Sequence, residues 1–142
     1  FCNTKSNRIT EKIVMEKKEI RTENAPAPVG PYSQAITAGG FIFCSGQIPL
    51  DPKTGALDDK DIESETTRVM ENLKAVLEEG GSSLDDIVKT TIFLRDMKDF
   101  ATVNTVYATY FKTTPPARST VQVAALPKGV GVEVECIAVV KK

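Results

Sequence analysis

The residues best suited to chemistry in this chain are an arginine and a glutamate on two consecutive predicted strands. Arg118 follows the dipeptide Pro115-Pro116 with one residue between them, and Glu133 comes fifteen residues after Arg118. Proline fixes its own φ and favours an extended conformation in the residue before it, so this approach leaves Arg118 little conformational freedom. A planar guanidinium suits a carboxylate ligand, and a carboxylate can position water or carry a proton. The pair is therefore a candidate site for a small anionic substrate.

Residue alternation predicts that both strands present polar side chains on one common face. Arg118, Thr120 and Gln122 share one face of the first strand, while Glu133 and Glu135 share one face of the second. We expect the two strands to pair as a hairpin, which would bring the guanidinium and the carboxylates together. A solvated cross-strand ion pair between Arg118 and Glu133 explains the same spacing, and spacing alone leaves both interpretations open.

Four further residues are candidates whose individual signals are weak. Tyr32 follows Gly-Pro, where a loop aromatic packs on the core or places its phenol at a pocket. Ser45 and Gly46 end a predicted strand, where they form a simple turn or expose backbone to a ligand. Asn104 falls within a predicted helix, where an amide often faces solvent.

The amino-acid composition limits the kinds of catalytic and metal site that the chain can form. The chain has 142 residues, no histidine, three cysteines and a net charge of −1. Without histidine, Ser-His-Asp catalysis, Cys-His catalysis and histidine-ligated zinc are excluded, and no cysteine pair has CxxC spacing. We therefore expect no metal site. The small net charge does not indicate a nucleic-acid partner, and no apolar run is long enough to span a membrane.

Residues 1–15 differ from the rest, since they are polar and basic and lack a secretory apolar stretch. We interpret them as an extension that precedes the domain. Three origins are open: a flexible segment, residues added for expression of the protein, or the remnant of a transit peptide. Residues 16–142 are expected to form one domain. Cys44 and Cys136 fall in strand patterns and favour a reducing compartment, so we expect the cytoplasm, with a mitochondrion or plastid as the alternative.

The remaining pattern predicts the order β-ββ-α-β-α-ββ, an α+β arrangement with a mixed sheet. Strands are expected at 19–23, 33–38, 41–45 and 87–94, before the two that carry Arg118 and Glu133. Helices are expected from Asp61 to Gly80-Gly81 and from about Lys98 through Phe111. Two helices cover only one face of such a sheet, and the other face is too apolar to be left in water. We therefore expect a homo-oligomer.

Several segments, in order, resemble the Rid/YjgF family of enamine/imine deaminases. The resemblance runs from about Ile20 to Val140. It is carried by Gly30-Pro31-Tyr32-Ser33-Gln34-Ala35, Ser45-Gly46-Gln47-Ile48-Pro49, Val88-Lys89-Thr90-Thr91, Asp99-Phe100-Ala101-Thr102-Val103-Asn104, Pro116-Ala117-Arg118-Ser119 and Glu133-Val134-Glu135.

This resemblance implies a chorismate-mutase-like homotrimer with sites in the clefts between subunits. It implies hydrolysis of 2-aminoacrylate and 2-aminocrotonate, or their imine tautomers, to 2-oxo acids and ammonia without a cofactor. Pyridoxal-phosphate-dependent dehydratases would release these substrates. By the same resemblance, Arg118 binds the substrate carboxylate and Glu133 orients water, while Tyr32, Ser45, Gly46 and Asn104 line the cleft.

One position departs from part of the family. Thr120 stands where some members have a cysteine, so thiol chemistry there is not expected, and Thr120 is retained only as a substrate-binding candidate. Two other functions remain as alternatives. One is an endoribonuclease that inhibits translation, which the absence of a basic stripe does not favour. The other is a ligand-binding or chaperone-like trimer without turnover.

Overall fold

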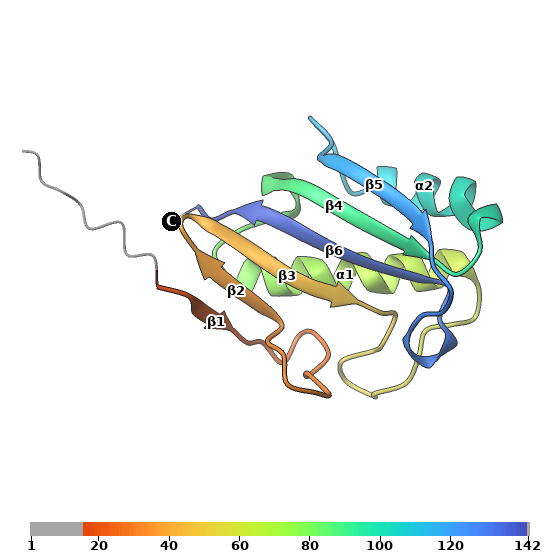
Figure 1. Ribbon diagram of the computed structural model, residues 1–142, viewed down its shortest axis with the longest axis horizontal. Coiled ribbons are helices and arrows are strands. Elements are labelled where there is room, and N and C mark those ends of the chain that lie inside the picture. Colours follow the sequence, from red (N-terminus) through yellow and green to blue (C-terminus); the bar gives the residue numbers. More distant parts are fainter. Residues whose placement is uncertain (1–15, 142) are drawn as a thin grey trace, which may run out of the picture.

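The computed structural model describes residues 16–141, which form one sheet and two α-helices (Figure 1). The predictions about residues 1–15 lie outside the described residues. The order of elements along the chain is the predicted β-ββ-α-β-α-ββ. The elements are β1 (Lys18–Ile20), β2 (Ala35–Ala38), β3 (Phe41–Gln47), α1 (Ile62–Glu79), β4 (Ile87–Leu94), α2 (Phe100–Ala108), β5 (Ala117–Gln122) and β6 (Val132–Val139), with short 3₁₀ turns at Leu84–Asp86, Met97–Asp99 and Pro127–Gly129.

The six strands form one mixed sheet in the order β1-β2-β3-β6-β4-β5. Strands β4 and β5 are parallel, and the other neighbours are antiparallel. The predicted hairpin between β5 and β6 is therefore wrong, because β4 lies between them. The cause is the helix α2: strands joined through a helix run parallel, so β5 pairs with β4 and leaves the other edge of β4 to β6.

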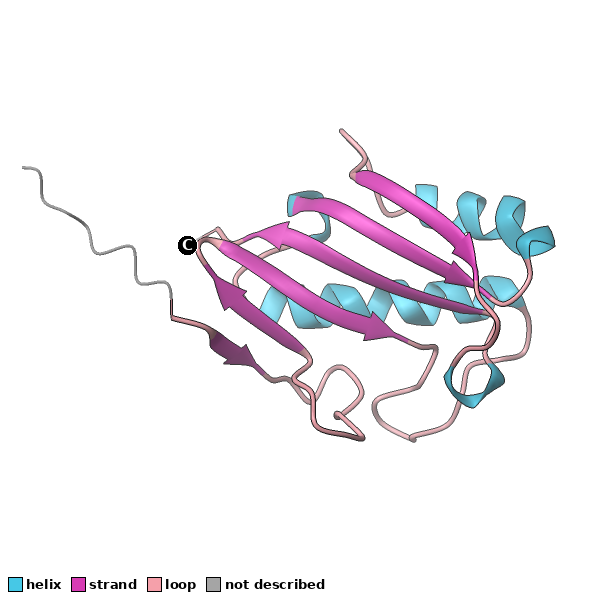
Figure 2. Cartoon of the chain, in the orientation of Figure 1, coloured by secondary structure: helices cyan, strands magenta, loops and turns pink. Residues whose placement is uncertain are grey.

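Both helices lie on the same face of the sheet, as predicted (Figure 2). Helix α1 contacts β3 and β6, and α2 packs beside α1. The core between the layers is built from alternate strand residues and one stripe of α1. Its fully buried members include Ile42, Val69, Leu73, Leu77, Ile92, Leu94, Val132, Val134 and Ala138.

Local sequence explains the element boundaries. Asp61 caps α1 by accepting a hydrogen bond from the Ser64 backbone N–H, and Gly80 ends the helix. Gly39 and Gly40 both have positive φ, as the tight β2–β3 turn requires. Helix α2 ends at Ala108, earlier than predicted. The aromatic residues beyond it, Tyr110 and Phe111, continue to pack against the core without being helical.

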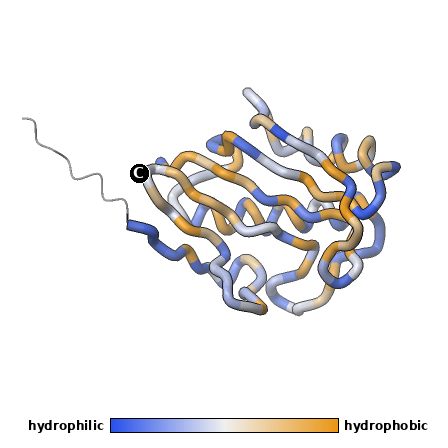
Figure 3. The backbone as a smooth tube through the Cα atoms, viewed as in Figure 1, coloured by the Kyte–Doolittle hydropathy of each residue, from blue (hydrophilic) through white to orange (hydrophobic). Residues whose placement is uncertain are grey.

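The other face of the sheet carries no helix from residues 16–141. Phe41, Phe43, Val121 and Val139 lie on strands and remain 38% to 44% exposed. Figure 3 shows hydrophobic residues recurring along the strands that form this face. We call this surface the open face. No helix within residues 16–141 is long and apolar enough to cross a membrane.

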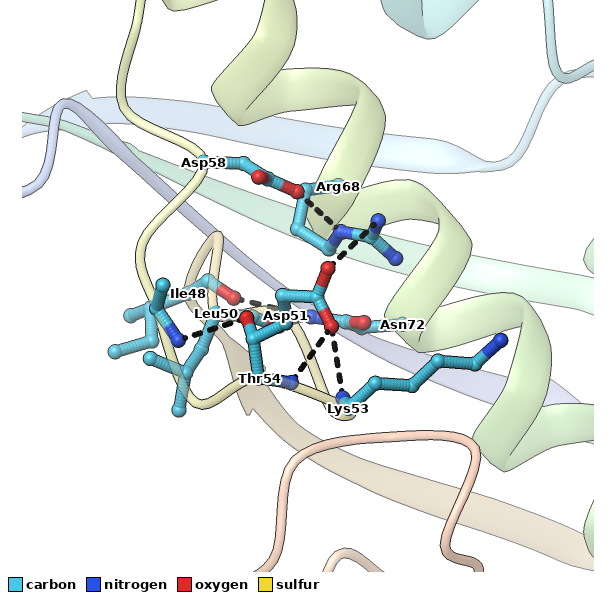
Figure 4. A network of polar contacts seen from close by, with 9 residues as sticks. Ile48, Leu50, Asp51, Lys53, Thr54, Asp58, Arg68 and Asn72 are labelled. Atoms are coloured by element: carbon cyan, nitrogen blue, oxygen red, sulfur yellow. Dashed lines mark hydrogen bonds and ion pairs between the residues drawn. The ribbon is translucent and has the colours of Figure 1, made fainter.

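The loop after β3 is tied to α1 by polar contacts (Figure 4). The Asn72 amide group donates to the carbonyl oxygens of Ile48 and Leu50, at 3.2 and 3.0 Å. Arg68 pairs with Asp58 at 2.6 Å, and Asp51 accepts backbone hydrogen bonds within its own turn. These contacts fix the path of the chain where it leaves β3.

We expect Asn72→Ala to lower the free energy of unfolding by about 1–3 kcal/mol, because two loop carbonyls lose their donor. Urea unfolding of the full chain measures this loss. Lys74→Ala, on the exposed side of α1, is the matched control and should stay within about 0.5 kcal/mol of the unmodified protein. Equal effects of the two changes would show that the amide does not hold the loop.

Candidate functional site

Arg118 and Glu133 point to opposite faces of the sheet. Arg118 lies beside Thr90 of β4 and packs against α2, on the face that the helices cover. Glu133 alternates with Val132 and Val134, which are buried under α1, so its side chain lies on the open face. The prediction of one common polar face within a chain is therefore wrong. Its error follows from the error in strand pairing.

Two aromatic rings of α2 flank the Arg118 guanidinium. Its Cζ lies 5.1 Å from the centre of the Tyr107 ring and 5.7 Å from that of the Phe100 ring. Cation–π contact of this kind holds a guanidinium without consuming its N–H donors. Tyr107 is fixed in turn by a 2.8 Å hydrogen bond between its hydroxyl and that of Thr90, which is fully buried.

Arg118 takes part in none of the ion pairs formed within residues 16–141. It lines a cavity of about 330 Å³, which we call the Arg118 pocket, together with Asn104, Tyr107, Ala108, Phe111, Thr113 and Pro115. An arginine held by aromatic rings, beside a cavity and paired with no carboxylate of the described residues, is suited to a ligand anion. The cross-strand ion pair with Glu133 is thereby excluded within one chain.

Asn104 and Thr120 lie on the Arg118 side of the sheet. Asn104 lines the Arg118 pocket, and Thr120 follows Arg118 by two residues on the same face of β5. The Asn104 Oδ1 and Thr120 Oγ1 atoms are buried and have no hydrogen-bond partner within the described chain. Buried polar atoms are normally paired, so both atoms have unused hydrogen-bonding capacity, and that of Asn104 lies at the pocket.

A second cavity, of about 460 Å³, contains the other predicted residues. We call it the Glu133 pocket. Its lining comprises Val29, Tyr32, Ser45, Gly46, Ile48, Pro127, Lys128, Glu133 and Glu135. A Cβ at Gly46 would overlap the Glu133 carboxylate, lying 2.9 Å from its Cδ, so the carboxylate occupies the space that a side chain would take. The carboxylate therefore rests directly on the Gly46 backbone.

An irregularity in β3 shapes this pocket. The pairing of β3 with β6 shifts between Cys44 and Gln47, which leaves Ser45 and Gly46 without register partners on β6. Such bulges re-aim the backbone beside functional sites. The Ser45 hydroxyl donates to the Ser33 carbonyl at 2.6 Å, so its oxygen keeps acceptor capacity. Tyr32 is half exposed at the pocket, and its hydroxyl accepts a hydrogen bond from the Val29 backbone.

Burial raises the pKa of Glu133, and the neighbouring charge of Glu135 raises it further. A carboxyl group with a raised pKa exchanges protons closer to neutral pH than an ordinary glutamate does. Such a group can accept a proton from water and return it in the same reaction. The Glu133 pocket is thus suited to acid–base chemistry, and the Arg118 pocket to binding an anion.

Sequence reasoning missed several residues of both pockets. Tyr107 lines the Arg118 pocket and the Phe100 ring contacts Arg118, yet both were predicted only as residues of a helix, and Pro127 and Lys128 were not candidates. No local signal marks Lys128, since its position depends on loops that meet only in the folded chain. Within residues 16–141, no group of three His, Cys, Asp or Glu side chains is arranged to hold a metal ion.

The chain matches, over residues 22–140, the family described as Endoribonuclease L-PSP. It belongs to this family, the Rid/YjgF family. A RutC family protein of Pyrococcus horikoshii is 57% identical over 122 residues, covering 86% of this chain and 97% of the relative. A relative from Salmonella typhimurium, named 2-iminobutanoate/2-iminopropanoate deaminase, is 51% identical over 125 residues, with coverage of 86% and 97%.

The solved structures agree with this assignment. A Rid family protein of Yersinia pestis, whose title calls its function unknown, superposes with a TM-score of 0.86. It is 53% identical, and the match covers 88% of this chain and all of that one. The α+β fold with a mixed sheet and two helices is therefore the fold of the family.

We expect Gly46→Ala to push the Glu133 carboxylate away from the β3 backbone and toward water. The pKa of Glu133 should then fall toward its ordinary value, as a carboxyl ¹³C NMR titration would show. Gly30→Ala is the control, because a Cβ there meets only the Tyr32 ring at 3.7 Å. An unchanged Glu133 titration in Gly46→Ala would refute the contact.

We expect Glu135→Gln to lower the pKa of Glu133, since it removes the like charge that raises it, while burial still holds the pKa above the ordinary value. The same NMR titration measures the shift. Glu19→Gln, an exposed carboxylate on β1, should leave the titration of Glu133 unchanged. A rise in the pKa with Glu135→Gln would contradict the assigned cause.

Proposed function

We propose that this protein hydrolyses reactive 2-imino acids, together with their enamine tautomers, to 2-oxo acids and ammonia. The observation that carries the proposal is an arginine held by two aromatic rings beside a cavity, with no carboxylate partner among residues 16–141. Its natural ligand is a small carboxylate, and the acid–base group Glu133 supplies the proton transfers that imine hydrolysis needs. The name of the Salmonella relative supports the same substrate class.

The reaction can be written with these groups. Arg118 binds the substrate carboxylate and orients the adjacent C=N carbon. Water adds to that carbon of the protonated imine as Glu133 accepts a proton from the water, giving a neutral carbinolamine. Glu133 returns this proton to the nitrogen, the C–N bond breaks and ammonia leaves. The remaining hydroxyl then loses its proton to Glu133 and becomes the C=O of the 2-oxo acid. An enamine enters after protonation at its terminal carbon, for which protonated Glu133 is a suitable donor.

The two pockets lie on opposite faces of one chain, so we propose that a complete site forms between two copies. Strand β5 is an edge strand of the sheet, and it carries Arg118. The Glu133 pocket lies on the open face. An edge of one copy placed over the open face of the next would join the two pockets. Repeated three times, this heterologous contact closes into a ring, the homotrimer implied by a chorismate-mutase-like arrangement.

The open face supports this assembly. It exposes Phe41, Phe43, Val121 and Val139, an apolar surface beside the charged pocket. Exposed apolar patches of this kind mark contact surfaces. The missing half of the site is carried by this same chain, so another copy is the occupant that completes the chemistry. We further propose that pyridoxal-phosphate-dependent dehydratases supply the imine, with no cofactor needed for its hydrolysis.

Endoribonuclease activity, which the family description names, is less well matched to the pockets. Glu133 and Glu135 both line the Glu133 pocket, and adjacent carboxylates repel a phosphodiester backbone. Electrostatic binding of RNA would also be weak in a chain with a net charge of −1. The non-catalytic alternative leaves the raised pKa of Glu133 without a role.

We expect a mixture of two inactive variants to regain activity, because the shared site needs Arg118 from one copy and Glu133 from another. Arg118→Ala and Glu133→Gln chains are unfolded together in equal amounts and refolded. In randomly mixed trimers, about a quarter of the sites then contain both native residues. Release of 2-oxo acid is followed with a serine or threonine dehydratase generating the imine, and trimer mass is checked by light scattering.

The control mixture pairs Arg118→Ala with the double variant Arg118→Ala, Glu133→Gln, which provides no native Arg118 and should stay inactive. If the unmodified protein does not accelerate 2-oxo acid release, the hydrolase proposal fails. If it does, but the first mixture stays inactive, the shared site fails and each chain acts alone. RNA cleavage by the unmodified protein, without imine hydrolysis, would favour the nuclease.

A further inference from the structure

Glu65 is a buried carboxylate for which the proposed reaction has no use. It lies in the first turn of α1 and is only 7% exposed. Its Oε1 accepts a hydrogen bond from the Gly131 backbone N–H at 2.8 Å. Burial raises the pKa of Glu65, while the Gly131 hydrogen bond and the charge of Arg95 oppose the rise. Burying a carboxylate costs free energy of folding. We therefore look for the effect of Glu65 in the segment that its carboxylate holds.

That segment is held from two sides. Arg95, just after β4, donates its backbone N–H to the Gly131 carbonyl at 3.0 Å, and its guanidinium donates to the Gly129 carbonyl. Gly131 itself fits tightly between these groups. A Cβ there would lie 2.8 Å from the Ile62 side chain and 3.0 Å from the Glu65 Oε2 atom. Glu65 and Arg95 therefore clamp residues 129–131 between α1 and the end of β4.

The clamped residues lead directly into the Glu133 pocket. Gly131 comes two residues before Glu133, and Pro127 and Lys128, on the other side of the clamp, line the pocket. Lys128 has a φ of +57°, in the left-handed region that a lysine rarely adopts. Such a conformation persists only where surrounding contacts hold it. Release of the clamp would therefore move both the start of β6 and the Lys128 turn.

We propose that Glu65 and Arg95 are positioning residues, which set the place of the Glu133 carboxylate and of Lys128 in the Glu133 pocket. The kinetic part of this inference rests on the proposed function, whereas its effect on Glu133 does not. The Arg118 pocket shares no residue with the clamped segment. Release of the clamp should therefore impair proton transfer more than binding of the substrate carboxylate.

The test compares Glu65→Ala, Glu65→Gln and Glu63→Ala in the full-length assembled protein. Glutamine keeps an oxygen that can accept from Gly131, whereas alanine removes it. Glu63 is exposed in the same turn of α1, so Glu63→Ala removes a similar charge without touching the clamp. The measurements are kcat and KM for imine hydrolysis, and the pKa of Glu133 by carboxyl ¹³C NMR titration.

We expect Glu65→Ala to lower kcat about tenfold or more while KM changes less than about threefold. The pKa of Glu133 should fall, because a displaced carboxylate is better hydrated. Glu65→Gln should stay within about threefold of the unmodified kcat, and Glu63→Ala should match the unmodified protein. If Glu65→Ala does not fold, Arg95→Ala replaces it, since Arg95 is exposed. That change removes the side-chain contact to Gly129 and the charge near Glu65, and keeps the backbone hydrogen bond to Gly131.

The inference is overturned if a folded Glu65→Ala protein has an unchanged kcat and an unchanged Glu133 titration. The same holds for Arg95→Ala where that variant replaces Glu65→Ala. The clamp would then be a purely structural feature. Failure of the proposed function is recognised separately. In that case the unmodified protein hydrolyses no imine, and the Glu133 titration alone decides whether Glu65 positions the carboxylate. A shifted titration then supports positioning, and an unshifted one refutes it.

Discussion

The pairing of β5 with β4 is the constraint on which the rest of the structure depends. The two strands are joined through α2, so they run parallel and lie side by side. This leaves β6 on the other edge of β4 and places α2 over the face that carries Arg118. The aromatic rings of α2 can then hold the guanidinium. The same pairing separates Arg118 from Glu133 within the chain, so the proposed site needs a second copy.

The two pockets are organised by different kinds of contact. Around Arg118 the supports are aromatic rings and one buried hydroxyl pair, which orient the cation without using its donors. Around Glu133 the supports are backbone features, namely the bulge in β3, the close contact of the carboxylate with the Gly46 backbone and the clamped turn before β6. The first arrangement suits recognition of an anion, and the second keeps an acid–base group partly out of water. Imine hydrolysis uses both properties.

Glu65 connects the fold to the chemistry. It belongs to α1, which otherwise covers the core, yet its carboxylate reaches the turn that precedes Glu133. A change in the packing of α1 on the sheet would therefore be transmitted through Gly131 to the Glu133 pocket. The loop after β3 is tied to the same helix through Asn72, and Ile48 of that loop also lines the pocket. Helix α1 thus supports the pocket from two sides.

Local patterns in the sequence determined the number, order and type of the elements. The β2–β3 turn at Gly39-Gly40, the Asp61 cap and the extent of β4 follow from backbone preferences and periodicity over a few neighbouring residues. The motifs around Tyr32, Ser45, Arg118 and Glu133 could also be identified from the sequence, and so could the family. Only the tertiary structure decided the neighbours of β4, β5 and β6, because their pairing depends on contacts between residues far apart in the chain. The division of the site between two faces, the rings around Arg118 and the clamp at Gly131 all follow from that pairing, and no local pattern encodes them.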